Sequence, residues 1–351
     1  MSTTYERTAL LALPGTKQGS SEKAGLLSWS RPYLIERVRD TGVDVVVSRG
    51  AKAFEGTQGT VTDVVRPEYT SDMCDVVVRN MGTVGLDDLS LIRNIVRAVE
   101  ADTATPFLNP NTVRGLAKDK YVIAQKALEP SGVYSRGAVY IGKDESDQDV
   151  DAKIASIPGP LVVAKPNGGL RSRGVLVGTK TEVISNLRGR EVPYIVEEKL
   201  DFSAPFPELR GINSDEQSRL EFANAQGVNK ELRMYYFGNG VWDSVGRIAR
   251  SGETDFRDDK WLYVDLESIP GGVIEGGNRV VRAIQRLTGT GEFNIAIDWV
   301  YASSHSDPEA QWKVMEVNAA EPQLVQLHEQ YDVGRRHHQE LATQISRIAL
   351  S

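Results

Sequence analysis

The chain has 351 residues, a formal net charge of −7 and a single cysteine, Cys74. This length supports a buried core in two or three packed parts. The acidic balance argues against a general nucleic-acid or membrane surface, and one cysteine excludes a disulfide framework and a cysteine metal site. No apolar run approaches the roughly 20 residues of a membrane span, and the polar start, residues 1–7, is unlike a signal peptide. We therefore expect a cytoplasmic protein.

Strand and helix patterns alternate over the first 110 or so residues. Short apolar runs predict buried strands, and apolar residues at helical spacing predict helices. This alternation is typical of a small α/β domain with a mostly parallel sheet, which we place at residues 1–111. The predicted strands are 8–13, 43–47 and 75–78, and the predicted helices are 24–40 and 87–100.

The rest of the chain is predicted to form a central, strand-rich domain at 112–200 and a C-terminal domain at 201–351. Thr112 can cap a helix that runs to about residue 128. The other central elements are strands at 139–141, 161–165, 174–178 and 194–197 and helices at 152–156 and 182–187. The C-terminal elements are strands at 232–237 and 242–249, a helix at 279–287, a hairpin at 293–318 and a helix at 333–349.

The predicted hairpin carries three side chains of a type that binds metal ions. Glu316 and Asn318 are two residues apart on one strand, so both leave the same face. Asp298 lies on the neighbouring strand and can reach that face. Two carboxylates and an amide oxygen form a hard oxygen site, which suits Mg²⁺ that shares its remaining positions with phosphates. The hairpin therefore predicts nucleotide chemistry.

A glycine-rich loop follows the predicted strand that ends at Lys165. Residues 167–174 contain three glycines, a serine and two arginines, and a second strand follows. Glycine lets backbone N–H groups approach phosphate oxygens, and the basic side chains add donors. The loop is not a Walker motif, because it lacks the Gly-Lys-Ser/Thr ending and no helix follows it. An ordinary hairpin with a basic loop explains the same residues equally well.

Other polar segments are open to two interpretations. The strand edge at 194–200 can offer backbone groups to an adenine ring, or Glu197 and Glu198 can simply be solvated. Lys120 lies on a predicted helix, where most lysines face solvent. Four arginines at 233–257 suggest recognition of anions by bidentate forks, although surface ion pairs with nearby acids account for them too; they are Arg233, Arg247, Arg250 and Arg257.

These segments follow one another in a characteristic order. They are Asn109-Pro110, Asp119-Lys120, Val163-Ala164-Lys165-Pro166 with its glycine-rich loop, Val196-Glu197-Glu198, Glu231-Leu232-Arg233, Arg250 with Asp255-Phe256-Arg257, Asp298, and Glu316-Val317-Asn318. The order and spacing resemble the ATP-grasp superfamily, and within it the branch that contains glutathione synthetase and the ribosomal-protein glutamate ligase. The resemblance covers about residues 109–325.

The resemblance implies a role for each motif and requires ATP with Mg²⁺, or with Mn²⁺ in its place. The implied ATP ligands are Lys120 and Lys165 at the phosphates, Gly168, Gly169, Ser172 and Gly174 in a flap that closes over them, and Glu197, Glu198, Lys199 and Leu200 in an adenine hinge that acts mainly through its backbone. The other implied residues are Arg233 and Arg250 at the phosphate or acyl-phosphate, Arg257 at the acceptor side, and Asp298, Glu316 and Asn318 at two Mg²⁺ ions. Strand ends of the N-terminal domain add candidate carboxylate-side contacts, namely Lys17, Ser20, Arg79 and Asn80.

The activity that the resemblance implies is ATP-dependent carboxylate–amine ligation through an acyl-phosphate, on an amino acid or a short peptide. A small-molecule kinase and a non-catalytic nucleotide-binding protein are the alternatives. Asp259 stands where the family usually has asparagine, and residues 202–224 form a longer connection than usual, so the substrates are not specified. Relatives are often dimers or tetramers, which makes a homo-oligomer an expectation by resemblance alone.

Overall fold

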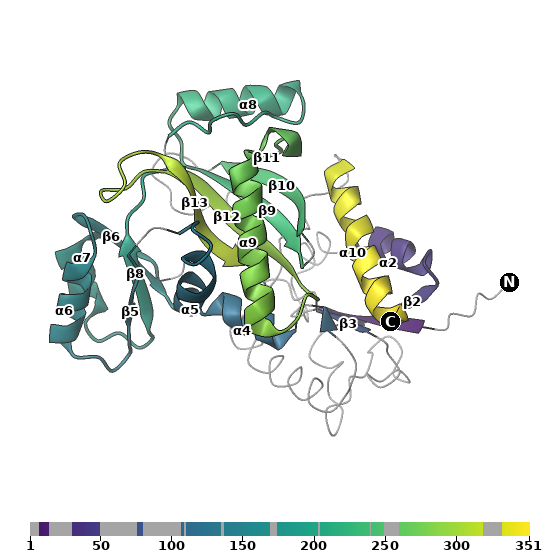
Figure 1. Ribbon diagram of the computed structural model, residues 1–351, viewed down its shortest axis with the longest axis horizontal. Helices are drawn as coiled ribbons and strands as arrows, with labels where there is room; N and C mark the ends of the chain where they lie inside the picture. The colour runs from purple at the N-terminus through teal and green to yellow at the C-terminus, as the bar shows by residue number, and fades with distance from the viewer. Residues whose placement is uncertain are drawn as a thin grey trace, which may run out of the picture. The chain divides into compact units, whose positions relative to one another are not determined.

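A computed structural model describes eleven stretches of the chain, which fall into two compact units (Figure 1). The first unit comprises the described residues within Met1–Arg114, Glu292–Asn294 and Ala319–Ser351, and the second comprises those within Gly115–Gly291 and Ile295–Asn318. The described residues are 7–13, 30–49, 76–79, 107–108, 110–134, 137–168, 174–202, 204–238, 240–248, 260–318 and 332–351.

The first unit contains a four-stranded sheet in the order β2-β1-β3-β4, in which every neighbouring pair is parallel. Its strands are β1 (Arg7–Leu13), β2 (Val43–Arg49), β3 (Val76–Arg79) and β4 (Phe107–Leu108). The predicted strands and their parallel arrangement are thus confirmed. Helix α2 (Ser30–Arg39) packs against the C-terminal helix α10 (Asp332–Leu350), and α10 also contacts β1 (Figure 1). The helix predicted at 87–100 lies outside the described residues.

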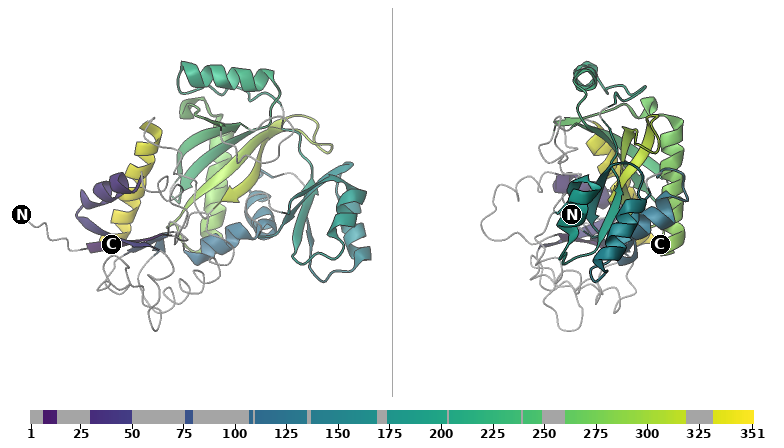
Figure 2. Two further views of the ribbon diagram at one scale, coloured as in Figure 1. Left: turned by 180° about the vertical axis from the view of Figure 1, so that it is seen from behind. Right: turned by 90° about the vertical axis from the view of Figure 1, so that its left-hand side faces the viewer.

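The second unit begins with an antiparallel sheet in the order β5-β8-β6-β7. Its elements are β5 (Val139–Ile141), α6 (Asp147–Ser156), β6 (Leu161–Pro166), β7 (Leu176–Thr179), α7 (Lys180–Leu187) and β8 (Tyr194–Glu198). Helices α6 and α7 cover one face (Figure 2), where Val162, Ala164 and Val196 join their core. Because side chains alternate along a strand, Lys165 and Glu197 lie on the opposite face.

The second unit also contains a five-stranded sheet in the order β11-β10-β9-β12-β13, with helices beside it. Its elements are α8 (Ser214–Ala225), β9 (Lys230–Phe237), β10 (Gly240–Ile248), β11 (Lys260–Leu262), α9 (Gly271–Thr288), β12 (Asn294–Ala302) and β13 (Gln311–Asn318). The predicted hairpin is confirmed as the antiparallel pair β12–β13. Helix α9 packs against the sheet through β9 and β10 (Figure 1) and begins eight residues before the predicted helix.

Helix α8 was not predicted from the sequence, which indicated only a long connection over residues 202–224. Its N-cap is Asn213, whose side chain accepts a hydrogen bond from the backbone N–H of Glu216 at 3.0 Å. Only Glu216, Leu220 and Ala223 of the helix are buried. A buried face of three residues, one of them a glutamate, gives a weak apolar periodicity, so the sequence pattern alone does not indicate this helix. Among the described residues, no helix has both the length and the apolar character needed to cross a membrane.

Lys230, at the start of β9, is a fully buried cation. Its ammonium group donates to the carbonyl of Val228 at 2.9 Å and lies 5.6 Å from the centre of the Phe206 ring. Burial disfavours the charged form and lowers the pKa of Lys230 from 10.5 to about 8. Between these two values the unfolded chain holds a proton that the folded chain lacks, so stability rises with pH across this window.

Replacing Lys230 by methionine is expected to raise the free energy of unfolding at neutral pH by about 1–2 kcal/mol. The change removes the penalty for burying a charge, while the lost bond to Val228 and the lost ring contact offset part of the gain. Urea unfolding of both proteins from pH 7 to pH 10 checks this. Wild type should gain stability above about pH 8, and the variant should lose that dependence. An equally steep pH dependence in the variant would assign the titration to another group.

Candidate functional site

A break in the predicted helix over 112–128 positions Lys120. Helix α4 (Asn111–Lys118) ends, and Asp119 becomes the N-cap of α5 (Lys120–Ile123), accepting from the backbone N–H of Val122 at 3.0 Å. Asn167, after β6, donates to Asp119 at 2.9 Å and accepts from the backbone N–H of Tyr121 at 3.0 Å. These bonds fasten the start of α5 to the end of the strand that carries Lys165. A π-helical turn, Ala124–Leu128, follows α5 directly.

A pocket in the second unit brings several of the predicted residues together. Two cations, Lys120 and Lys165, and two carboxylates, Glu197 and Glu316, line it. The polar groups stand among apolar side chains, which is the usual composition of a small-molecule site. The other lining residues are Ala117, Ile123, Ala124, Leu128, Tyr134, Ile195, Met315 and Val317.

Each lysine of this pocket forms an ion pair with one of its carboxylates. Lys120 donates to Glu316 on β13, and the ammonium of Lys165 lies 2.5 Å from Glu197 on β8. Burial opposes ionisation of Glu316, but Lys120, Lys165 and Arg233 together hold its pKa below the ordinary value of 4.5. Glu316 is therefore an anion at neutral pH. The pairs leave both lysines charged and close to the same small space.

Arg233 and Asp298 form a buried bidentate pair next to this pocket. The guanidinium of Arg233, on β9, donates to both carboxylate oxygens of Asp298, on β12, at 2.6 and 2.7 Å. Glu231 lies 3.7 Å from the same guanidinium, as expected for residues two apart on one strand face. Burial alone would lower the pKa of Arg233, but Asp298 and Glu231 raise it well above its ordinary value. The guanidinium is therefore permanently charged.

Asp298, Glu316 and Asn318 meet on one face of the β12–β13 hairpin. Asp298 is the register partner of Glu316, and the amide of Asn318 donates to Asp298 at 2.7 Å. Within the described ranges, no group of three or more His, Cys, Asp or Glu side chains could hold a metal ion. Two carboxylates and an amide make a smaller donor set. Such a set fits Mg²⁺, which keeps few protein ligands and takes the others from water and phosphates.

The residues predicted for an adenine hinge point in different directions. Glu197 faces the pocket, whereas Glu198 accepts hydrogen bonds from the backbone N–H of Ser306 at 2.9 Å and from its hydroxyl. Lys199 donates its backbone N–H to Leu161 at 3.0 Å, and Leu200 is buried in a core cluster. The side chain of Glu198 thus anchors the β12–β13 loop. A hinge role for this segment through its backbone stays a prediction.

The ends of the predicted flap are Gly168 and Gly174. Their φ angles of 146° and 73° are values that side-chain-bearing residues rarely adopt. Arg79 is the last residue of β3. The remaining predicted site residues lie outside the described residues, and their roles stay predictions; they are Lys17, Ser20, Asn80, Gly169, Ser172, Arg250 and Arg257.

Three residues that shape this pocket were not predicted from the sequence. Tyr134 follows the π-helical turn without a recognisable motif, yet its hydroxyl donates to Glu197. Asn167 belongs to the glycine-rich loop by position, but its side chain braces Asp119. Met315 lines the pocket beside Glu316, and its apolar character alone indicated only a strand. A helix-capping pattern at Asp119, with a break before Lys120, was the one local signal available.

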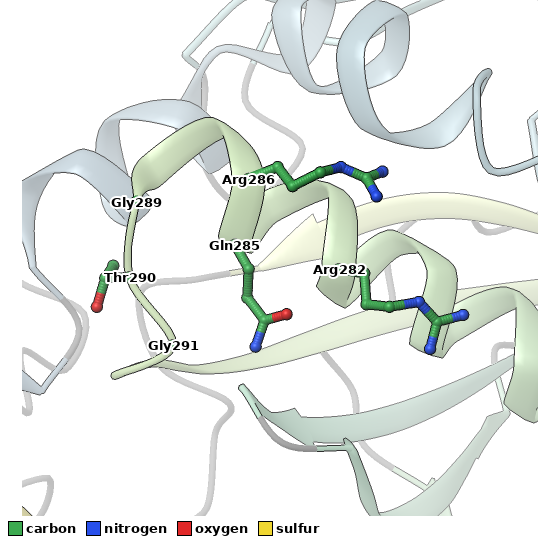
Figure 3. A pocket seen from close by; sticks show the side chains of 6 residues that line it. All are labelled: Arg282, Gln285, Arg286, Gly289, Thr290 and Gly291. Atoms are coloured by element: carbon green, nitrogen blue, oxygen red, sulfur yellow. The ribbon is translucent and has the colours of Figure 1, made fainter.

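A second hollow lies at the C-terminal end of α9 (Figure 3). Arg282, Gln285 and Arg286 project from the helix, and the turn through Gly289 and Thr290 closes one side. Both arginines are exposed. The described residues that line it include no carboxylate, so they do not provide the ligands that Mg²⁺ prefers. The pocket between Lys120 and Glu316 is therefore the better candidate for chemistry.

Solved structures are similar to this chain over almost its full length. D-cycloserine synthetase DcsG matches with a TM-score of 0.60 and 15% identity over 96% of this chain and 99% of its own. D-alanyl-alanine synthetase A from Vibrio cholerae matches with a TM-score of 0.60 and 14% identity over 98% of both chains. The ATP-grasp ligase PsnB, solved with a variant of its minimal precursor, Mg and ADP, matches with a TM-score of 0.53 and 15% identity over 97% and 100%.

The chain has the ATP-grasp fold. No protein-family model and no curated protein matches the sequence. At these levels of identity the structures establish the fold alone, so the predicted ATP-grasp fold is confirmed and the glutathione synthetase branch stays a prediction.

Proposed function

We propose that this ATP-grasp chain is an ATP-dependent carboxylate–amine ligase. It would form an amide bond through an acyl-phosphate and release ADP and phosphate, with an amino acid or a short peptide as substrate. The observation that carries the proposal is the convergence of Lys120, Lys165 and Arg233 with Asp298 and Glu316. Three cations and two metal-type carboxylates in one place suit a polyphosphate bound with a divalent ion.

The cations of this chain have separate tasks in the proposed reaction. Lys120 and Lys165 bind the ATP phosphates as point charges, because each ammonium donates in three directions. Arg233 stabilises the charge that develops on the transferring phosphoryl group. Asp298 fixes the plane of the Arg233 guanidinium through two hydrogen bonds. Such preorganised charges lower the barrier because they need no rearrangement during the reaction.

A metal ion at Asp298, Glu316 and Asn318 would neutralise phosphate charge and orient the triphosphate. These three residues offer oxygen ligands from two adjacent strands. In the structure Asp298 pairs with Arg233, and Glu316 pairs with Lys120. With ATP bound, Lys120 would exchange the Glu316 carboxylate for a phosphate, which would leave the Glu316 oxygens available as metal ligands.

The chemistry requires positioning more than covalent catalysis. The substrate carboxylate attacks the γ-phosphate, ADP leaves, and an amine then attacks the acyl-phosphate and expels phosphate. No side-chain nucleophile is needed. The acyl-phosphate must be kept from water, a task for the flap at 168–174, with Arg250 at the acyl-phosphate and Arg257 at the acceptor. PsnB, also solved with a precursor peptide and AMPPNP, supports the choice of a peptide-like substrate class.

Two other activities fit the same pocket. An ATP-grasp kinase would phosphorylate one small molecule and stop there, and it differs from a ligase only in needing no amine. A non-catalytic nucleotide-binding protein is disfavoured by the complete set of Lys120, Lys165, Asp298 and Glu316. Its hallmark would be ATP binding without turnover.

The test is ADP release from Mg²⁺-ATP in the presence of pooled amino acids and dipeptides. We compare wild type with Glu316→Ala and with Glu309→Ala, a control at an exposed residue of the same hairpin. The ligase predicts release that requires both an acid and an amine, survives in Glu309→Ala and falls at least a hundredfold in Glu316→Ala. Release with one substrate and a stable phosphorylated product would favour the kinase. ATP binding without turnover across the pool would favour the non-catalytic protein.

A further inference from the structure

The carboxylate of Glu197 is held by two partners at once. It is 2% exposed. One oxygen pairs with the ammonium of Lys165 at 2.5 Å, and the other accepts a hydrogen bond from the hydroxyl of Tyr134. A buried carboxylate is costly unless it is paired and hydrogen-bonded. The two partners therefore share the task of stabilising this charge.

The two partners come from different parts of the second unit. Lys165 lies on β6, which pairs with β8, so it belongs to the same sheet as Glu197. Tyr134 follows a segment that is attached to the other sheet. The backbone N–H of Val314, on β13, donates to the carbonyl of Val133 at 2.9 Å, and Arg279, on α9, donates to the carbonyl of Ser131 at 2.9 Å. The tyrosine thus links Glu197 to β13 and α9.

We propose that Tyr134 is a positioning residue that holds the Glu197 carboxylate so that Lys165 is free to bind a nucleotide phosphate. The inference rests on the proposed function. A bound phosphate and Glu197 compete for the same ammonium group. With Tyr134 in place, Glu197 keeps a strong donor when Lys165 moves to the phosphate. Without the Tyr134 hydroxyl, the buried carboxylate depends more on Lys165, and the phosphate must compete against a tighter pair.

Tyr134→Phe tests this, because it removes the hydroxyl and keeps the ring. We measure binding of ATP and of adenosine by calorimetry, with Mg²⁺ and without any acid or amine substrate. The expected result is about a tenfold weaker affinity for ATP, with the affinity for adenosine changed less than twofold, since only a phosphate competes for Lys165. Tyr301→Phe is the matched control: its ring lies 5.6 Å from Trp312, and it is not among the described residues that line the pocket.

A double variant separates positioning from general damage. Glu197→Gln removes the charge that competes for Lys165, so Tyr134→Phe combined with Glu197→Gln should bind ATP better than Tyr134→Phe alone. Urea unfolding checks that every variant is folded. If Tyr134→Phe alone does not fold, the double variant is compared with Glu197→Gln, so that the two proteins still differ only in the Tyr134 hydroxyl. Equal losses for ATP and adenosine, or no recovery in the double variant, would overturn the role of Tyr134. Wild type that binds no ATP would overturn the proposed function together with this inference.

Discussion

Asp298→Asn is expected to lower the free energy of unfolding by about 3 kcal/mol, because it leaves the Arg233 guanidinium buried without its bidentate partner. Arg233 is 7% exposed and Asp298 is 1% exposed, so solvent cannot replace the lost charge. Glu231, at 3.7 Å, compensates only in part. Urea unfolding at neutral pH measures the effect.

Two further variants locate the cause of that loss. Asp147→Asn removes the acid of an exposed pair whose two side chains are 60% and 62% exposed, 3.9 Å apart, and it should change stability by less than about 0.5 kcal/mol. Combining Asp298→Asn with Arg233→Met removes the unpaired charge and should restore part of the stability. Equal midpoints for Asp298→Asn and Asp147→Asn would show that the buried pair contributes nothing beyond a surface contact.

The same substitution has a functional consequence under the proposed ligase reaction. Asparagine offers one oxygen in place of two, so it is a weaker metal ligand. It also cannot accept both hydrogen bonds that hold the plane of the Arg233 guanidinium. Loss of one such electrostatic element commonly reduces turnover by a hundredfold to a thousandfold. If turnover falls much further than the fraction of folded protein, Asp298 has a role in the reaction as well as in folding.

Local sequence patterns predicted those helices and strands in which buried apolar side chains recur at a regular spacing. Most strands of the three sheets follow from short apolar runs, and β12–β13 follows from two alternating segments around a turn. The short strands β4 and β11 were not predicted. Helix α8 escaped prediction because only three of its side chains are buried. The break at Asp119 was missed although Asp is a common N-cap residue, because the other partner that holds this N-cap, Asn167, lies 48 positions along the chain. A pattern within one segment contains no information about such a partner.

The site residues also divide into those that a local pattern predicts and those that depend on a distant partner. Period-two alternation predicted that Glu316 and Asn318 share one strand face, and that Glu231 and Arg233 share another. In the structure Asn318 and Arg233 both donate to Asp298, and Glu231 lies beside Arg233. Alternation also separates Glu197 from Glu198, but it does not indicate which of the two faces the pocket. That choice depends on the face covered by α6 and α7. Tyr134 was unpredictable, because its contact with Glu197 joins residues 63 positions apart.

The close approach of α9 to its sheet is the other feature with a large expected effect. Gly277 is buried, and a Cβ atom at this position would overlap the hydroxyl and ring carbons of Tyr236. Tyr236 is itself fully buried on β9, so its ring cannot turn out into solvent to make room. At Gly276, the preceding residue, a Cβ would lie 2.7 Å from Val133 and 2.9 Å from Trp299. The two glycines therefore set the distance between helix and sheet.

Gly277→Ala is expected to lower the free energy of unfolding by about 3 kcal/mol, since overpacking a tight core forces the helix or the ring to shift. Alanine favours a helix over glycine by about 1 kcal/mol, and the predicted loss is what remains after that gain. Gly272→Ala is the matched control on the same helix, because a Cβ there meets nothing within 4 Å; it should leave stability unchanged or raise it by up to about 1 kcal/mol. Urea unfolding of both variants decides. Equal stability of the two would mean that the helix yields without cost, and that Tyr236 does not fix its distance from the sheet.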